Sequence, residues 1–228
     1  RDLHSFPTRR SSDLNAADYS KGNRFRSAQV MREMPKTRLF GNAMLTFMVK
    51  LASGYWHVFD PQNGYLAIRS DTARQLNLRK LDNRYFFEDD MLISLNILEA
   101  RVLDVPMPPI YLGKHSSLRP FRALFTHSTR LFLGFLKRIW MRYVIYDFSP
   151  IALLLGLGAI LSLFGTGWGA WAWIMSYRSG KVSSTGTVML SVLPLVLGIQ
   201  FLLTALQLDI QNSPRPSHDP KPSKGAVK

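Results

Sequence analysis

Cysteine is absent from the 228 residues of the sequence, and acidic residues are scarce. The lack of cysteine excludes a disulfide framework, thiolate metal sites and a cysteine nucleophile, and it is compatible with a domain that faces the cytoplasm. Asp and Glu number 15 against 29 Lys and Arg, so the formal net charge is +14, while 46% of the residues are hydrophobic. Basic and apolar residues are concentrated in different stretches, which is typical of a membrane protein rather than of a soluble domain.

Residues 1–14 show neither helical nor strand periodicity, and they lack the apolar centre of a signal peptide. Within them, the run HSFPTRRSSDL (4–14) resembles the in-frame translation of a widely used sequencing adapter. We therefore expect residues 1–14 to be an artefactual or disordered leader and set them aside. The rest of the sequence remains strongly basic without them.

Residues 15–117 have the short elements and turn signals of a partial α/β domain. Apolar residues at helical spacing predict a helix over 39–52. The segment from Asp60 to Gly64 contains a proline and an Asn-Gly pair, which predicts a tight turn before a strand over 65–68. The other predicted elements are a helix over 70–76 that begins with its own Ser70 cap, a helix over 88–100 and a strand over 102–105.

The remainder of the chain carries three apolar patterns. Residues 118–147 place basic side chains largely off an apolar stripe of helical spacing. This predicts juxtamembrane amphipathic helices in the membrane interface, although such helices also pack on their own domain. Residues 148–177 and 182–208 contain no charged residue, and each exceeds the roughly 20 residues that span a bilayer. We therefore predict two transmembrane helices over 148–210, followed by a disordered tail over 211–228.

Basic residues flank the predicted spans over 119–142 and 215–228, whereas the short connection between the spans carries only Arg178 and Lys181. The positive-inside bias places both flanks, and with them the catalytic domain and the tail, in the cytoplasm. We expect the membrane to be a bacterial inner membrane. Gly165 and Gly169 form a small-xxx-small pair that could join transmembrane helices, including those of a homo-oligomer.

Two groups of charged residues could carry chemistry. Arg24 and Arg38 lie where loops are expected to meet a helix start, and guanidinium groups there can bind phosphate oxygens. Solvated surface charge is the plainer explanation for two arginines taken alone. Asp60 precedes the predicted turn, and Glu88 and Asp90 open a predicted helix. Such carboxylates can orient sugar hydroxyls or act as a general base, although the helix dipole alone favours acidic residues in a first turn.

These charged residues belong to a longer ordered series of motifs. The series is Lys21-Gly22-Asn23-Arg24, Met34-Pro35, Arg38, Gly41-Asn42, Ser53-Gly54-Tyr55-Trp56, Asp60-Pro61-Gln62-Asn63-Gly64-Tyr65, Arg84-Tyr85-Phe86-Phe87-Glu88 and Asp104-Val105-Pro106-Met107. In this order, and followed by predicted membrane helices, the motifs resemble family 2 glycosyltransferases of the polyprenyl-phosphate (dolichyl-phosphate) mannose or glucose synthase type. The resemblance covers the chain from Asp18 to Asn212.

The resemblance implies an α/β fold, namely the C-terminal half of a GT-A (Rossmann-like) domain. It also implies an inverting transfer of a hexosyl group, mannose or glucose, from a nucleotide-diphosphate sugar to a polyprenyl phosphate. Under this resemblance Arg24 and Arg38 match the arginines that hold the acceptor phosphate, and Asn42 lies at a neighbouring polar position of that site.

The same resemblance implies three catalytic residues. Asp60 matches the acid of the turn motif near the reacting sugar, and Glu88 and Asp90 match the acidic pair at the helix start. Family members also hold Mg²⁺ or Mn²⁺ through an N-terminal Asp-x-Asp, and this sequence contains no Asp-x-Asp. We therefore expect the metal to be used by a longer parent protein, and this chain to be a truncated and inactive fragment.

A non-enzymatic membrane module is the alternative from another class. Such a module would bind or present a lipid-linked phosphate, or help it to cross the bilayer. Nucleic acid is not an expected partner, because the basic residues concentrate beside the predicted spans. The expected partners are a polyprenyl phosphate, a nucleotide sugar and the membrane itself.

Overall fold

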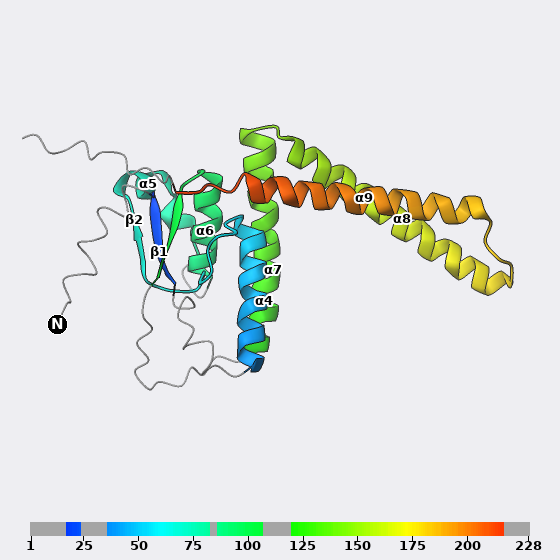
Figure 1. Ribbon diagram of the computed structural model, residues 1–228, viewed down its shortest axis with the longest axis horizontal. Coiled ribbons are helices and arrows are strands. Elements are labelled where there is room, and N and C mark those ends of the chain that lie inside the picture. Colours follow the sequence, from blue (N-terminus) through cyan, green and yellow to red (C-terminus); the bar gives the residue numbers. More distant parts are fainter. Residues whose placement is uncertain (1–16, 24–35, 83–85, 107–119, 217–228) are drawn as a thin grey trace, which may run out of the picture. The chain divides into compact units, whose positions relative to one another are not determined.

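The computed structural model describes residues 17–23, 36–82, 86–106 and 120–216 (Figure 1). These residues form a mixed α/β chain that is mostly helical, with one three-stranded sheet. The chain divides into two units. The globular unit extends to Arg138 and includes the residues from Ser213 onward, and the hairpin unit extends from Ile139 to Asn212. The predicted leader and most of the predicted tail lie outside the described residues.

The sheet has the order β2-β1-β3. Its central strand β1 (Tyr19–Asn23) pairs antiparallel with β2 (Leu66–Ile68) and parallel with β3 (Val102–Pro106). The sequence predicted no strand before residue 65, so this central strand was missed. The reason is that β1 reads YSKGN, without the alternation of apolar and polar residues that signals a half-buried strand. Pairing on both sides holds these polar residues in the sheet.

Besides the sheet, the globular unit contains the helices α4 (Lys36–Ser53), α5 (Ser70–Gln75) and α6 (Phe87–Ile97), most of α7 (Pro120–Trp140), and a short 3₁₀ turn η1 (Leu78–Lys80). The predicted helices exist, with two corrections. Arg69, not Ser70, occupies the N-cap of α5, and its side chain makes no capping hydrogen bond. Helix α6 ends before residue 100 because Glu99 has a positive φ of 55°.

The end of α6 is a Schellman motif. The amide of Ala100 donates to the carbonyl of Leu95 at 3.0 Å, and the amide of Glu99 donates to the carbonyl of Asn96 at 3.0 Å. This pattern satisfies the last carbonyls of a helix when the next residue is left-handed. Glycine usually occupies the left-handed position, so the glutamate there hid the helix end from sequence analysis.

The core of the globular unit contains residues from two strands and three helices. It includes Tyr19 of β1, Val49 of α4, Leu92 of α6, Val102 of β3 and Leu131 of α7. Helix α7, predicted as a membrane-interface helix, therefore also packs on its own domain through one side. A Cβ at Gly134 of this helix would lie 2.5 Å from Ile93 Cδ1, so α7 and α6 approach closely at this glycine.

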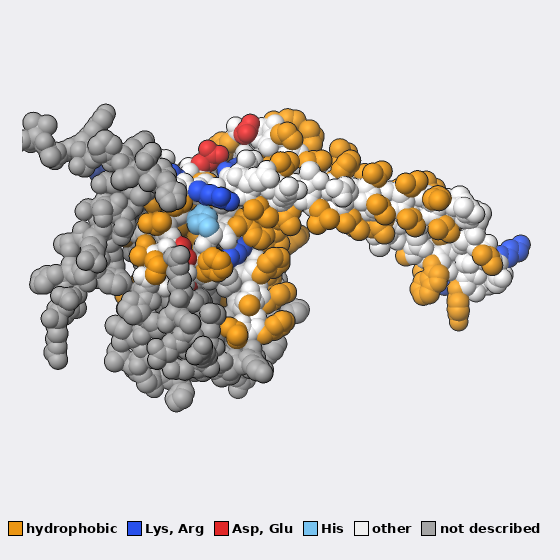
Figure 2. Space-filling model, in the orientation of Figure 1, with side chains coloured by type: hydrophobic (Ala, Val, Ile, Leu, Met, Phe, Trp, Pro, Cys, Tyr) orange, Lys and Arg blue, Asp and Glu red, His pale blue; other side chains and the backbone are white. Residues whose placement is uncertain are grey.

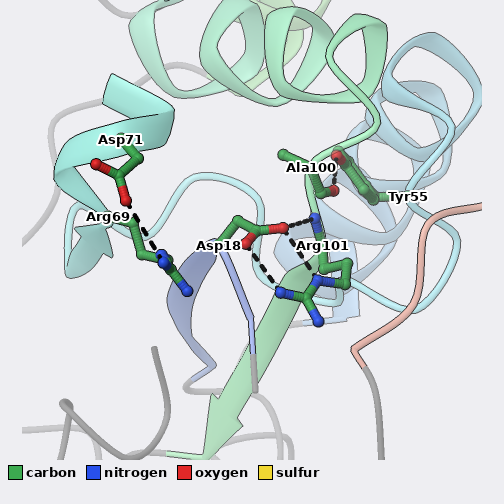
Figure 3. A network of polar contacts seen from close by, with 6 residues as sticks. All are labelled: Asp18, Tyr55, Arg69, Asp71, Ala100 and Arg101. Atoms are coloured by element: carbon green, nitrogen blue, oxygen red, sulfur yellow. Dashed lines mark hydrogen bonds and ion pairs between the residues drawn. The ribbon is translucent and has the colours of Figure 1, made fainter. Parts of the chain in front are cut away.

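The loop after α4 protects the outer edge of β3. Tyr55 donates its hydroxyl to the carbonyl of Ala100 at 2.5 Å (Figure 3). His57 Nε2 lies 2.8 Å from the carbonyl of Val102. The carbonyl can only accept, so His57 Nε2 carries the hydrogen. Next to this edge, Arg101 binds the Asp18 carboxylate through Nε, Nη2 and its backbone amide at 2.9 to 3.1 Å. These bonds fix β3 beside β1.

Arg138, near the end of α7, is completely buried. Its Nε donates to the carbonyl of Ala52 at 2.9 Å, and its Nη2 donates to the carbonyl of Leu51 at 3.2 Å. Both carbonyls belong to the last turn of α4, where backbone acceptors lack partners within the helix. Arg138 therefore joins the end of α4 to α7.

The hairpin unit contains the short π-helical turn η2 (Met141–Tyr146), α8 (Pro150–Ser179) and α9 (Thr185–Gln211). Both predicted spans are thus helices, of 30 and 27 residues, and both are long and apolar enough to cross a membrane. At about 1.5 Å per residue each exceeds the roughly 30 Å thickness of a bilayer's hydrocarbon core. These two helices suggest a membrane protein.

Helices α8 and α9 pack closely at glycines. A Cβ at Gly165 would lie 2.7 Å from the backbone oxygen of Ser191, and one at Gly198 would lie 2.6 Å from the backbone nitrogen of Ser162. Gly165, which the sequence offered as a contact to other helices, therefore serves packing within one chain. Near the end of α9, Asp209 accepts a hydrogen bond from the hydroxyl of Tyr143 in η2 at 2.6 Å.

Gly54 provides a test of the junction between α4 and α7. This residue has a φ of +73°, and a Cβ there would lie 2.6 Å from Nη1 of Arg138. We expect Gly54→Ala to lower the free energy of unfolding by at least ~2 kcal/mol, because it adds left-handed strain and displaces the buried guanidinium. Urea unfolding of the detergent-solubilised chain, read by pulse proteolysis of the globular unit, measures this loss.

Gly64→Ala is the matched control, because a Cβ at Gly64 would meet no atom within 4 Å. We expect this variant to stay within about 0.5 kcal/mol of the parent. Equal stabilities for the two variants would contradict the close packing of Arg138 against Gly54.

Candidate functional site

The candidate site lies where β1 and β3 end. In α/β sheets ligands bind at the carboxyl ends of parallel strands. Lys21 of β1 lies opposite Asp104 of β3, and Asn23, the last residue of β1, lies opposite Pro106. The Asn23 amide donates to the Asp104 carboxylate at 2.6 Å, which closes this end of the strand pair. Polar residues thus gather at the edge where the fold places ligands.

Asp89, in the first turn of α6, is the unusual acid of this region. Its side chain is 1% exposed, and neither carboxylate oxygen has a hydrogen-bond partner among the described residues. Burial raises the pKa of Asp89 to about 7, and the charge of the buried Lys21 only partly offsets this effect. The carboxyl group therefore changes protonation near neutral pH, as expected of a functional acid or base.

The neighbours of Asp89 in the first turn of α6 have different surroundings. Glu88 is half-buried, and its charge contributes to raising the pKa values of Asp89 and of Tyr19, both of which are raised mainly by burial. Asp90 accepts a hydrogen bond from the amide of Asp82 at 3.2 Å and lies 3.5 Å from Nζ of Lys137 on α7. Asp90 therefore ties α6 to α7, and its predicted catalytic role stays a prediction.

The predicted turn holds Asp60 close to the end of β1. Asn63 donates its side-chain amide to the carbonyl of Gly22 at 2.8 Å, and the Gly22 amide donates to the carbonyl of Tyr65 at 2.9 Å. Asp60 itself is 1% exposed, and its carbonyl accepts from the amide of Asn63 at 3.3 Å. The turn thus brings one predicted catalytic acid toward the strand that carries Lys21.

The predicted acceptor residues are described only in part. Arg24 directly follows β1 in sequence and lies outside the described residues. Arg38 lies in the first turn of α4, and nothing is described of its side chain. Asn42 lies one turn later and is half-buried. Residues four apart share a helix face, so Arg38 and Asn42 belong to one face of α4.

Two residues of the site were not predicted from the sequence. Lys21 was named only as part of a motif, although it lies in the central strand and is fully buried. Asp89 was passed over between Glu88 and Asp90. A signal for it existed, because Asp89, Leu92, Ile93 and Asn96 recur at helical spacing, and all four are buried. The middle acid of the three is the one on the core face of α6.

No metal centre emerges from the described part of the chain. Within it, no group of three or more His, Asp and Glu side chains is placed to hold an ion. Two of the acids near the site, Asp90 and Asp104, already accept hydrogen bonds from protein groups. The described residues therefore do not fit a Mg²⁺ or Mn²⁺ site.

Comparison with known proteins gives one informative relation. No family model and no solved structure match the chain. The chain is 28% identical over 97 residues to the UDP-N-acetylglucosamine–dolichyl-phosphate N-acetylglucosaminyltransferase of Methanococcus voltae. The matched segment is 42% of this chain and 38% of the relative, so the chain spans about two-fifths of that relative's length. The match supports a relation to glycosyltransferases that act on dolichyl phosphate.

The raised pKa of Asp89 gives a testable pH dependence. Unfolded, this carboxyl has a pKa near 3.8; folded, it has a pKa of about 7. Because the folded state binds the proton more tightly, its contribution to stability is present at low pH and is lost as the pH rises toward 7. Asparagine does not titrate, so Asp89→Asn does not lose this contribution. We expect the free energy of unfolding of Asp89→Asn, relative to that of the parent, to increase by roughly 2 kcal/mol from pH 5 to pH 7.

The measurement is the urea midpoint of the globular unit of both proteins across this pH range. Asp71→Asn is the control, because the Asp71 side chain is 67% exposed. Parallel pH profiles for the parent and Asp89→Asn would show that the Asp89 pKa is ordinary.

Proposed function

We propose that this chain is part of a glycosyltransferase that moves a sugar from a nucleotide-diphosphate sugar to a polyprenyl phosphate at the cytoplasmic face of a membrane. The relation to a dolichyl-phosphate sugar transferase carries the proposal. Two helices long and apolar enough to span a bilayer support it, because a polyprenyl chain stays in the membrane. The basic flanks of those helices support the cytoplasmic orientation.

The identity of the transferred sugar is also a proposal. The sequence motifs favour mannose or glucose, whereas the relative from Methanococcus voltae is named as an N-acetylglucosaminyltransferase. All three sugars travel on nucleotide diphosphates, and the inverting displacement is the same for each. The assay below therefore offers all three donors.

The proposed reaction needs charge alignment more than proton transfer. A phosphate oxygen of the acceptor attacks the anomeric carbon, the new C–O bond forms, and the bond to the nucleotide diphosphate breaks with its electron pair on the leaving group. A phosphate monoester is already anionic at neutral pH, so it needs a positive cradle rather than a base. We assign this cradle to Arg24 and Arg38, with Asn42 one turn after Arg38 on α4.

The carboxylates then have orienting roles. Asp60, Glu88 and Asp90 are the proposed catalytic residues, and Asp60 lies on the turn that docks on β1. Carboxylates on loops and helix starts can fix the hydroxyls of a donor sugar. Asp89 is a further candidate, because it is a buried acid without a hydrogen-bond partner among the described residues. The charge of the buried Lys21 acts on Asp89, so we propose that both residues belong to the same part of the site.

We also propose that the whole enzyme uses Mg²⁺ or Mn²⁺. When bound, such an ion would offset the charge of the leaving diphosphate. The described residues do not fit such an ion, so we assign no metal-dependent step to them.

Acceptor binding is the first test, and it needs only the chain itself. In nanodiscs, native mass spectrometry or fluorescence titration with a short polyprenyl phosphate measures binding. We expect Arg38→Ala to weaken it about tenfold or more, because it removes a charge-assisted contact to phosphate. Arg79→Ala is the matched control, since Arg79 is exposed and lies outside the site. Equal binding by both variants would remove Arg38 from the acceptor site.

Transfer is the second readout of the same proposal. Membranes that contain the complete reading frame around this chain are given UDP-N-acetylglucosamine, GDP-mannose or UDP-glucose with Mn²⁺. We expect labelled sugar to appear on the polyprenyl phosphate with one donor, and Asp60→Asn to abolish the transfer. Lipid-phosphate binding without transfer from any donor would instead favour a non-enzymatic module that presents a lipid-linked phosphate.

A further inference from the structure

Helix α4 belongs to the globular unit, yet it exposes a row of large apolar side chains. Phe40 is 69% exposed, Met44 is 44% exposed and Phe47 is 50% exposed. Their spacing of four and three residues places them on one face of the helix. The opposite side of α4 supplies Val49 and Ala52 to the core. Helix α4 is therefore apolar on two sides, and the described residues cover only one of them.

Helix α7 repeats this arrangement. Its inner side places Leu131 in the core and Gly134 against Ile93. Its outer side exposes Phe132, Leu133 and Leu136, which are 46% to 59% exposed. The sequence predicted a single apolar stripe on this helix. The structure divides the apolar residues between a side that packs on the domain and a side that does not.

The two helices lie next to each other. Ser128 of α7 lies 3.8 Å from the sulfur of Met48 on α4, and Arg138 of α7 binds the carbonyls at the end of α4. The contacts follow the same order along both helices, so α4 and α7 run in the same direction, as Figure 1 also shows. In Figure 2, orange side chains follow the position of α4 on the surface. The exposed apolar residues of both helices therefore belong to one region of the globular unit.

We propose that the exposed face of α4, together with that of α7, inserts into the surface of a lipid bilayer. This docking face comprises Phe40, Met44, Phe47, Phe132, Leu133 and Leu136. Contiguous exposed apolar surface marks an interaction site, and Phe, Leu and Met on amphipathic helices suit the boundary between headgroups and acyl chains. The proposal rests on the membrane attachment suggested by α8 and α9 and is independent of glycosyl transfer.

Continuity of the chain favours a bilayer over other occupants. Helix α7 ends at Trp140, η2 follows directly, and α8 begins at Pro150. The outer side of α7 is thus separated from the first residue of a candidate span by only a few helical turns. Lys50 of α4 lies 3.7 Å above the ring of Phe59, which is itself 55% exposed, so a cation accompanies the apolar face. Anionic headgroups attract such cations.

The docking face has a consequence for the site. Arg38 and Asn42, the predicted acceptor residues on α4, come two residues before Phe40 and Met44, so they belong to the side of the helix opposite the docking face. A helix whose docking face meets the acyl chains would hold these two positions on its headgroup side, about one helix diameter from the hydrocarbon. The docking face is thus a device that sets the height of a lipid-phosphate site above the hydrocarbon.

The test uses the absence of cysteine from the sequence. Single-cysteine variants at Phe40, Met44 and Phe47 of the full chain receive a nitroxide spin label in nanodiscs of phosphatidylcholine and phosphatidylglycerol. Power-saturation EPR then compares collision with oxygen, which concentrates in the bilayer, and with a water-soluble nickel chelate. Gln75→Cys on α5 is the control, because Gln75 is exposed on a helix outside the docking face.

We expect the ratio of oxygen to nickel accessibility to be several-fold higher at all three α4 positions than at Gln75. Ratios at α4 equal to that at Gln75 would overturn the proposal, because the face would then be in water. Low accessibility to both reagents, with spin–spin broadening between labels, would also overturn it, because a second copy of the chain would then cover the face. Circular dichroism of each labelled variant checks that the helices remain intact.

Discussion

The buried guanidinium of Arg138 is the contact on which the arrangement of the globular unit depends most. A fully buried charge is costly unless its hydrogen-bonding capacity is used. Here the charge faces the last carbonyls of α4, which carry the negative end of the helix dipole and lack partners within the helix. Gly54 follows directly, and only a residue without a Cβ leaves room for the guanidinium there. The loop that protects β3 begins at this glycine, so one side chain fixes a helix end, a loop start and α7.

This contact makes α7 part of two structures. Through Leu131, Gly134 and Arg138 it belongs to the core of the domain that holds Lys21 and Asp89. Through the chain that follows Trp140 it leads to α8 and α9, the candidate spans. A polyprenyl phosphate carries its phosphate at the membrane surface, so a transferase that uses it must keep its site near that surface. Helix α7 therefore contributes to the core of the domain and leads in sequence to the candidate spans.

The sequence was informative where one physical signal dominated. Two long segments without charge predicted α8 and α9, because only a membrane or a large core accommodates them. It was less informative where a residue served neighbours distant in sequence. Strand β1 has no apolar alternation, since pairing with β2 and β3 holds it, and Asp89 looked like its neighbours until the buried face of α6 was known. Helix α7 showed an apolar stripe, but only the packing showed which part of it is covered.

Arg138 couples the end of α4 to α7. Hydrogen exchange of the full chain in nanodiscs, read by mass spectrometry, tests it most directly in the parent and in Arg138→Met, which keeps the length of the side chain but removes its donors. We predict that the amides of the last turn of α4 and of residues 54–58 exchange at least tenfold faster in the variant, while those of α8 and α9 are unchanged. Unchanged protection over these segments would contradict the claim.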